Sequence, residues 1–167
     1  MYSRNLRDKL LLSLSKLGVP VLVTGSKNKI DSEIKKEIPN EPNIFNFIGD
    51  TSLEEYFALS QLCSAYIGMD TLNMHIAASQ NKRIFAIFGP TNIKMWSPWS
   101  NALKKATNQN KHKQTYGNIT LFQSSIPCPS CGMIGCGSSH NKDSFSFNIE
   151  PSEIFNEILK WHKHFEE

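Results

Sequence analysis

The sequence predicts an α/β fold, a Rossmann-like parallel sheet with flanking helices. Short apolar runs alternate with helix-like segments along most of the chain, which is the pattern that βαβ units require. Two of these runs, AYIGM and RIFAIFG, lead directly into polar loops that begin at Asp70 and Pro90. Parallel α/β sheets bind ligands at the carboxyl ends of their strands. The two loops are therefore the first candidates for a ligand site.

The amino-terminal segment predicts an amphipathic helix over residues 4–17, because Leu6, Leu10 and Leu14 recur at the helical period. The next elements are predicted at residues 19–24 (strand), 30–38 (helix), 43–48 (strand), 52–63 (helix), 65–69 (strand), 72–81 (helix) and 83–88 (strand). Pro39 ends the first of these later helices. Thr51 or Ser52 can cap the helix after it.

The carboxyl-terminal part predicts one more strand, at residues 118–123, and a closing helix that starts at Pro151 and runs through Trp161. Between these elements lie two long segments predicted to be irregular, residues 92–117 and 124–148. Long loops in a compact domain are often functional.

Composition favours a single domain over residues 1–167, since 40% of the residues are hydrophobic and the formal net charge is only +3. This modest charge does not indicate a nucleic-acid partner. The basic residues gather slightly at Lys104, Lys105, Lys111, His112 and Lys113. That group is either a solvated face or an attraction for acidic lipid or phosphate. No apolar run approaches the roughly 20 residues that span a bilayer, so we expect a cytoplasmic protein.

Asp70 and Thr71 open a helical stretch, MHIAASQ, directly after a predicted strand. The start of a helix presents unpaired backbone N–H groups and a positive dipole end, which suit a phosphate or diphosphate. His75 lies one turn further along the same helix. The residues themselves thus predict a phosphorylated small molecule as ligand.

Five sequence elements in order resemble a known family: VLVTG with Asp31, GDTSLEE, DTLNMHIAAS, FGPT and Trp96-Ser97-Pro98. The stretch from Val21 to Pro98 is similar to the carboxyl-terminal, donor-binding half of the heptosyltransferases, glycosyltransferase family 9. The resemblance implies half of a GT-B fold, in which two domains face each other across a cleft. It also implies transfer of heptose from an ADP-linked donor to the lipopolysaccharide core by direct displacement, with no cofactor or metal required. The expected location is cytoplasmic, peripheral at the inner face of the inner membrane.

The resemblance gives Asp70, Thr71 and His75 possible roles, each with a structural alternative. Asp70 would accept hydrogen bonds from donor-sugar hydroxyls, or it caps the helix. Thr71 and the N–H of Leu72 would hold the diphosphate. His75 would donate to a phosphate oxygen, or it is a partly buried helix residue.

The remaining candidates come from the other matched elements. Asp31 would contact the nucleotide ribose, or it is a surface carboxylate near a helix start. Thr51 would line the base pocket, or it caps a helix. Pro90 and Thr91 would shape the loop that faces the cleft.

The sequence departs from the family pattern in ways that affect function. Leu72 replaces a glycine, and its side chain is expected to crowd the diphosphate. The family's catalytic base and its phosphate-binding lysine lie upstream of the matched region, so no residue here inherits either role. The alternative function is therefore a non-catalytic remnant or subunit that binds a nucleotide or a partner.

The first predicted element is a helix. We expect the strand that precedes this helix in the family to be missing, together with the amino-terminal acceptor domain. In the usual doubly wound order that strand would separate the strands at residues 19–24 and 65–69. Unpaired buried backbone is costly, so either these two strands close up on each other or a separate chain supplies the missing piece.

Cys128, Cys131, Cys136 and His140 have a spacing compatible with a structural zinc site. Reduced loop thiols and a disulfide are the alternatives, and a reducing cytoplasm disfavours the disulfide. A zinc site would also permit a third function, that of a zinc-stabilised interaction module. Cys63, alone on an apolar helix face, is expected to be a small buried residue.

Overall fold

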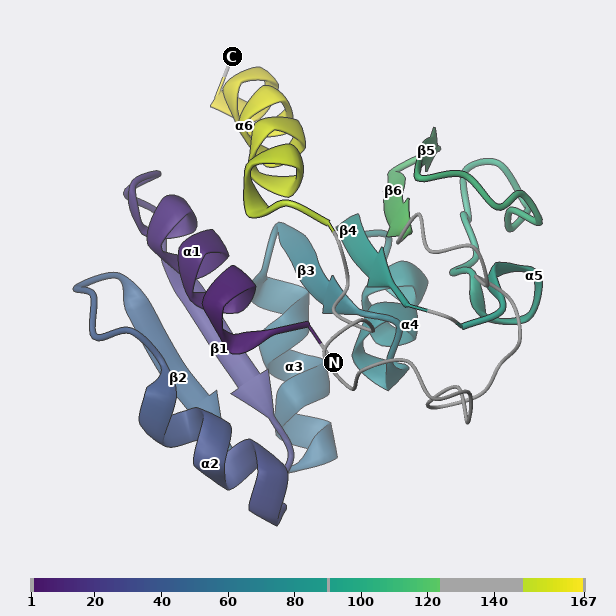
Figure 1. The fold of residues 1–167 in the computed structure, drawn as a ribbon. Helices are drawn as coiled ribbons and strands as arrows, with labels where there is room; N and C mark the ends of the chain where they lie inside the picture. Colours follow the sequence, from purple (N-terminus) through teal and green to yellow (C-terminus); the bar gives the residue numbers. More distant parts are fainter. Residues whose placement is uncertain (1, 90, 124–148, 167) are drawn as a thin grey trace, which may run out of the picture. The chain divides into compact units, whose positions relative to one another are not determined.

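The structure, a computed structural model, describes residues 2–89, 91–123 and 149–166 (Figure 1). The chain divides into two compact units. Unit 1 comprises residues 1–3 and 60–150, and unit 2 comprises residues 4–59 and 151–167. Both combine strands with helices, so the α/β class predicted from the sequence is confirmed. None of the described helices has the length and apolar character of a membrane span.

Unit 1 contains a four-stranded sheet in the order β3-β4-β6-β5. Its strands are β3 (Ala65–Met69), β4 (Arg83–Phe88), β5 (Lys113–Tyr116) and β6 (Ile119–Gln123). β3, β4 and β6 are parallel, with Ala65 opposite Arg83 and Ile84 opposite Ile119. All of β6 and all of β4 after Arg83 are buried, as expected for the central strands of a parallel sheet.

Helix α4 (Leu72–Ser79) crosses from β3 to β4 and packs on both strands. Its buried residues Met74, Ala77 and Ala78 join a hydrophobic cluster with Ile84, Ala86, Phe88, Ile93, Ile119 and Leu121. The apolar face of this helix therefore fixes where its amino terminus lies relative to the ends of the strands.

The prediction that residues 92–117 are irregular is wrong, because this segment contains the short helix α5 (Ile93–Trp96) and the strand β5. β5 pairs antiparallel with β6 through a tight turn at Gly117, whose φ is +54°. Glycine adopts this left-handed backbone without steric cost. The side chains of β5 alternate between exposed and half-buried, as in an edge strand.

Unit 2 contains a two-stranded parallel sheet of β1 (Val21–Gly25) and β2 (Ile44–Ile48), with Val21 opposite Ile44. Its helices are α1 (Arg4–Ser15), α2 (Lys29–Glu37) and α6 (Pro151–Glu166), and α3 (Leu53–Leu62) begins in this unit. Leu10, Leu11 and Leu14 of α1 are buried, and α1 packs against α6.

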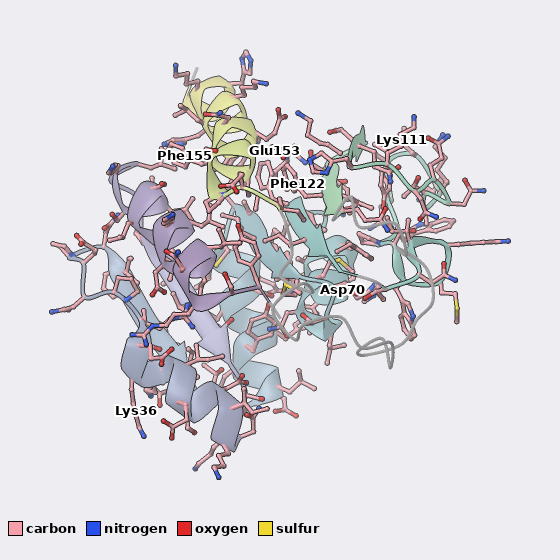
Figure 2. The ribbon with its side chains drawn as sticks, viewed as in Figure 1. Lys36, Asp70, Lys111, Phe122, Glu153 and Phe155 are labelled. Atoms are coloured by element: carbon pink, nitrogen blue, oxygen red, sulfur yellow. The ribbon has the colours of Figure 1, made fainter. Side chains whose placement is uncertain are left out.

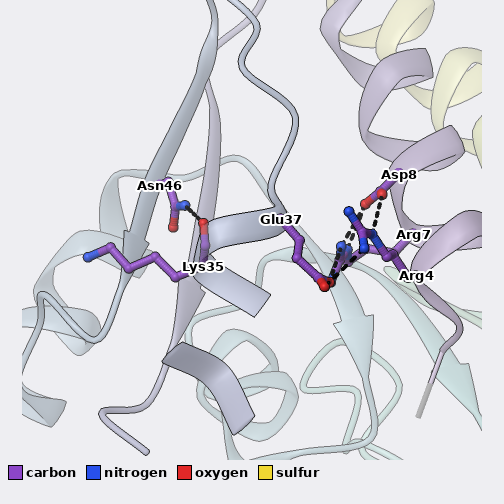
Figure 3. A network of polar contacts seen from close by, with 6 residues as sticks. All are labelled: Arg4, Arg7, Asp8, Lys35, Glu37 and Asn46. Carbon is purple, nitrogen blue, oxygen red and sulfur yellow. Dashed lines mark hydrogen bonds and ion pairs between the residues drawn. The ribbon is translucent and has the colours of Figure 1, made fainter. Parts of the chain in front are cut away.

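Charged side chains hold α1 to the end of α2 (Figure 3). Arg4 Nη1 lies 3.0 Å from Glu37 Oε1, and Arg7 Nη2 lies 3.6 Å from the other oxygen of the same carboxylate. Asn46 of β2 donates to the backbone carbonyl of Lys35 at 2.9 Å. These contacts fasten both α1 and β2 to one short helix.

Every helix and strand predicted from the sequence is present, and α6 extends beyond the predicted end at Trp161. β1 belongs to the sheet of unit 2 and β3 to the sheet of unit 1. Each is an edge strand within the described part of the chain.

Candidate functional site

Asp70 lies immediately beyond β3, at the carboxyl end of the parallel strands (Figure 2). The backbone N–H of Thr71 donates to the carbonyl of Met69 at 2.9 Å, which closes a three-residue turn with Asp70 at its centre. The end of β3 thereby turns sharply into α4 and projects the Asp70 side chain from the corner.

Tyr66 stabilises the turn between β3 and α4, a role that was not predicted from the sequence. Its hydroxyl donates to the same Met69 carbonyl at 2.7 Å and lies 3.4 Å from Thr71 Oγ1. Burial raises the pKa of Tyr66 to about 12, so the phenol keeps its proton and remains a donor at neutral pH.

Gly68 makes room for the tyrosine. Residues two apart on a strand share a face, and a Cβ atom on Gly68 would lie only 2.6 Å from Tyr66 Oη and 2.9 Å from its Cζ. A Tyr-x-Gly pattern at the end of a strand, directly before an acidic loop, was the signal available in the sequence.

Thr91, in the loop after β4, lies near enough to Asp70 for its side chain to lower the pKa of that carboxylate. Asp70 and Thr91 belong to the loops that follow two adjacent parallel strands. Pro90, the other candidate in this loop, lies outside the described residues.

Asp70 is half-buried, and burial is the main influence that raises its pKa. The side chain of Thr91 opposes this effect, and the charge of His75 opposes it more weakly. A carboxylate kept in this partly desolvated position costs folding free energy.

Helix α4 begins with an unusual cap. Its N-cap is Thr71, not Asp70, so the alternative in which Asp70 caps the helix is wrong. The Thr71 side chain makes no capping hydrogen bond. The Thr71 side chain therefore does not satisfy any of the backbone N–H groups at the start of this helix.

Leu72 and His75 occupy the first turn and a half of this helix. Leu72 is 59% exposed, so its side chain extends into solvent from the first helical position. His75 is half-buried and electrostatically coupled to Asp70. Asp70, Thr71, Leu72, His75 and Thr91 all belong to unit 1.

Asp31 belongs to unit 2 and organises the turn between β1 and α2. Its Oδ2 accepts from Ser26 N and Ser26 Oγ, each at 2.8 Å, and from Asn28 Nδ2 at 3.0 Å. Asn28 in turn caps α2 by accepting from Asp31 N at 2.8 Å. Asp31 thus has a structural function, while the hydrogen bonds found for its carboxylate in the described residues all fall on one oxygen.

Thr51, also in unit 2, is half-buried and precedes the residue that caps α3. Ser52 Oγ accepts from Glu55 N at 3.2 Å, and Glu55 Oε2 accepts from Ser52 N at 2.7 Å. This reciprocal pair is a capping box. The capping alternative therefore applies to Ser52 and is wrong for Thr51.

The predicted zinc ligands Cys128, Cys131, Cys136 and His140 lie outside the described residues. Across the parts that the structure does describe, no cluster of three or more His, Cys, Asp or Glu side chains is arranged to hold a metal. Cys63 is half-buried, and burial raises the pKa of its thiol.

Comparison with known proteins gives a family match and several relatives. Residues 7–124 match the family model of glycosyltransferase family 9 (heptosyltransferase). Lipopolysaccharide heptosyltransferase 3 of Escherichia coli is 32% identical over 87 residues, which cover 50% of this chain and 26% of that protein. Lipooligosaccharide heptosyltransferase 2 of Haemophilus influenzae is 34% identical over 96 residues, 55% of this chain and 28% of the relative.

A longer match is to lipooligosaccharide heptosyltransferase 2 of Campylobacter jejuni, which is 26% identical over 145 residues, 84% of this chain and 40% of the relative. The chain therefore spans well under half the length of these proteins. Among solved structures, the ADP-heptose lipopolysaccharide heptosyltransferase II of E. coli superposes with a TM-score of 0.62 at 18% identity. That match covers 99% of this chain and 43% of the other, and it establishes a shared fold.

Proposed function

Because the chain belongs to glycosyltransferase family 9, the heptosyltransferase family, we propose that it is the donor-binding part of a glycosyltransferase. The proposed ligand is a nucleotide-diphosphate sugar, ADP-heptose, and the proposed acceptor is the lipopolysaccharide core. The observation that carries this proposal is the proximity of Thr91 to the Asp70 carboxylate at the start of α4, where the threonine side chain lowers the carboxylate's pKa. It brings two family motifs together beside a helix start whose N-cap side chain makes no capping bond.

Each residue of this site has a chemical part in donor binding. The Asp70 carboxylate accepts hydrogen bonds from sugar hydroxyls, which would compensate for its partial burial. Thr71 Oγ1 and the first N–H groups of α4 donate to the diphosphate, and the positive end of the helix dipole favours its negative charge. His75 adds a further donor one turn along.

Asp31 and Thr51 are proposed to bind the nucleoside, on the ribose and the base respectively. The lone pairs on the second oxygen of Asp31 suit the two hydroxyls of a ribose. We assign no catalytic base to this chain. The acceptor and its base are proposed to come from another domain or from a separate chain, at the cytoplasmic face of the inner membrane.

Calorimetric titration of the purified chain with ADP and ADP-heptose tests the proposal, after circular dichroism has established that the chain folds. Wild-type protein should bind saturably, and Asp70→Ala should weaken binding about ten-fold or more, on the order of 1.4 kcal/mol. Glu54→Ala is the matched control, because it removes an exposed carboxylate from the first turn of another helix. A folded wild-type chain that binds neither compound rejects the donor site and favours a repurposed domain.

The cysteine cluster stays a separate proposal, that of a structural zinc site at Cys128, Cys131, Cys136 and His140. Elemental analysis of protein purified without added metal separates it from reduced thiols. About one zinc per chain would support it. Cys131→Ser should then abolish zinc binding, since tetrahedral zinc needs all four ligands. Zinc-free protein with titratable thiols would reject it.

A further inference from the structure

The segment after β4 exposes four large apolar side chains within nine residues. Met95 is 69% exposed, Trp96 and Trp99 are each 51% exposed, and Leu103 is 46% exposed. Exposed apolar side chains that form a contiguous patch commonly mark a protein or membrane interaction site. These four, with the exposed lysines Lys94, Lys104, Lys105, Lys111 and Lys113, are here called the tryptophan–lysine surface.

Hydrogen bonds within unit 1 fix the backbone that carries these exposed side chains. Ser97 Oγ donates to Thr107 O at 2.7 Å, and Ser100 N donates to Lys105 O at 2.9 Å. Tyr116 of β5 donates to the Pro98 carbonyl at 2.7 Å, which ties the segment to the β5–β6 hairpin. α5 and that hairpin lie at the same end of unit 1 (Figure 1), and Figure 2 shows Lys111 beside β5.

The turn from Ser100 to Lys105 is built so that its tip faces solvent. Ser100 Oγ accepts from Leu103 N at 3.3 Å, and Lys104 adopts a φ of +53°, in the left-handed region that non-glycine residues rarely occupy. Ser100 itself is buried, whereas Leu103, Lys104 and Lys105 are exposed. An apolar side chain and two ammonium groups are thereby presented together.

The charge of this region is one-sided. Between Asp70 and Asp143 the sequence has no aspartate or glutamate and eight lysines or arginines. The tryptophan–lysine surface contributes five of these cations. Its natural complement is therefore an anionic surface.

We propose that the tryptophan–lysine surface docks unit 1 onto an anionic lipid bilayer. Tryptophan prefers the boundary between headgroups and acyl chains, and methionine and leucine can enter the apolar side of that boundary. Lysines around them bind acidic headgroups. A single-stranded nucleic acid would also attract lysine and tryptophan, but the aliphatic Met95 and Leu103 offer no flat face for a base to stack on.

This inference goes beyond donor binding, because its residues differ from those proposed to bind the donor. Co-sedimentation of the full 167-residue chain with vesicles tests it. Wild-type protein should bind vesicles of phosphatidylglycerol mixed with phosphatidylcholine, bind phosphatidylcholine alone weakly, and dissociate as salt rises.

Two variants separate the apolar from the ionic contribution. Trp96→Ser with Trp99→Ser should lower the partition coefficient, and Lys104→Glu with Lys105→Glu should lower it about ten-fold or more, as expected for two cations at a charged bilayer. The matched control is Lys160→Glu with Lys163→Glu, which changes net charge equally on α6 in the other unit. All substituted residues at the surface are exposed, and circular dichroism verifies the fold of each variant.

Equal loss of binding in the surface and control charge variants would overturn the proposal, since net charge alone would then explain it. A wild-type protein that does not bind anionic vesicles would also overturn it. Surface variants that bind vesicles as well as wild type does would overturn it too, if they no longer bind a single-stranded oligonucleotide or no longer self-associate in sedimentation velocity. ADP-heptose titration of the tryptophan variant should match wild type, which keeps this test distinct from that of the donor site.

Discussion

The side chain of Thr91 lowers the pKa of the Asp70 carboxylate, so the loops that follow β3 and β4 come together at these two residues. The two residues are far enough apart in sequence to belong to separate motifs, yet their strands are neighbours in a parallel sheet. This effect partly offsets the cost of burying the ionised carboxylate. The first prediction follows from this pair.

Thr91→Val removes the hydroxyl while nearly preserving shape. We expect lower stability in chemical denaturation and weaker ADP-heptose binding, because Asp70 loses the side-chain hydroxyl that lowers its pKa. Thr115→Val is the control, since the Thr115 hydroxyl bonds only to a neutral partner, Thr120 Oγ1 at 2.9 Å, in the described contacts. Equal effects of the two variants on donor binding would remove any special role for Thr91.

Asp70→Asn is expected to raise stability at pH 7. The pKa of Asp70 is higher in the folded chain than its ordinary value, so the folded state binds the proton more tightly than the unfolded state does. The stabilisation of the folded state that comes from this tighter proton binding is therefore complete below the ordinary carboxyl pKa of about 4. It is lost as pH rises through the folded pKa. Thermal denaturation across pH should show wild type and Asp70→Asn converging in acid and separating toward neutrality. A constant difference at all pH values would contradict this account.

Leu72→Gly should strengthen donor binding. The leucine side chain extends into solvent at the first position of α4, where a diphosphate would approach the backbone N–H groups. Glycine removes that obstruction, and its cost to the helix is about 1 kcal/mol or less. Calorimetry with ADP-heptose measures the change, and Leu72→Ala is the graded control. Unchanged or weaker binding in both variants rejects the crowding argument.

Gly68→Ala should be destabilising, because the new methyl group would collide with the Tyr66 ring. Overpacking of this kind typically costs about 1–3 kcal/mol. Tyr66→Ala removes the obstruction, so the double variant should be more stable than the sum of the single effects predicts. Additive free energies of unfolding would show that Gly68 and Tyr66 are not coupled through this contact.

Ser52→Ala and Thr51→Ala form a pair that separates capping from binding. Ser52 provides the capping bond of α3, so its loss should lower the free energy of unfolding by about 1 kcal/mol. Thr51→Ala should leave stability nearly unchanged and weaken nucleotide binding. A variant at Thr51 that lowers stability as much as Ser52→Ala would return the capping role to Thr51.

The sequence carried enough information for the order of the elements, because apolar runs such as RIFAIF and helical leucine spacing record burial directly. It also located Asp70 and Thr91 at strand ends. It could not show that their side chains meet, since the register of β3 against β4 is a long-range property. Nor could it distinguish Thr51 from Ser52 as the cap, because both residue types serve at that position.

The missed elements lack the signals on which sequence reasoning depends. α5 has only four residues, which is too short to display helical periodicity. β5 reads KQTY, a polar edge strand with no apolar alternation, and its pairing depends on the turn at Gly117. Tyr66 was read only as part of an apolar run, while its function at the corner depends on the direction of one hydroxyl.

The edges of the two sheets also have a consequence for handling this protein. β1 reads VLVTG and β3 reads AYIGM, and each pairs along one side only in the described chain. Natural edge strands are usually protected by lysine, proline or a bulge, and these two contain neither of those residues. Such edges are templates on which other polypeptides can add strands. We therefore expect the isolated chain to self-associate through these edges at high concentration.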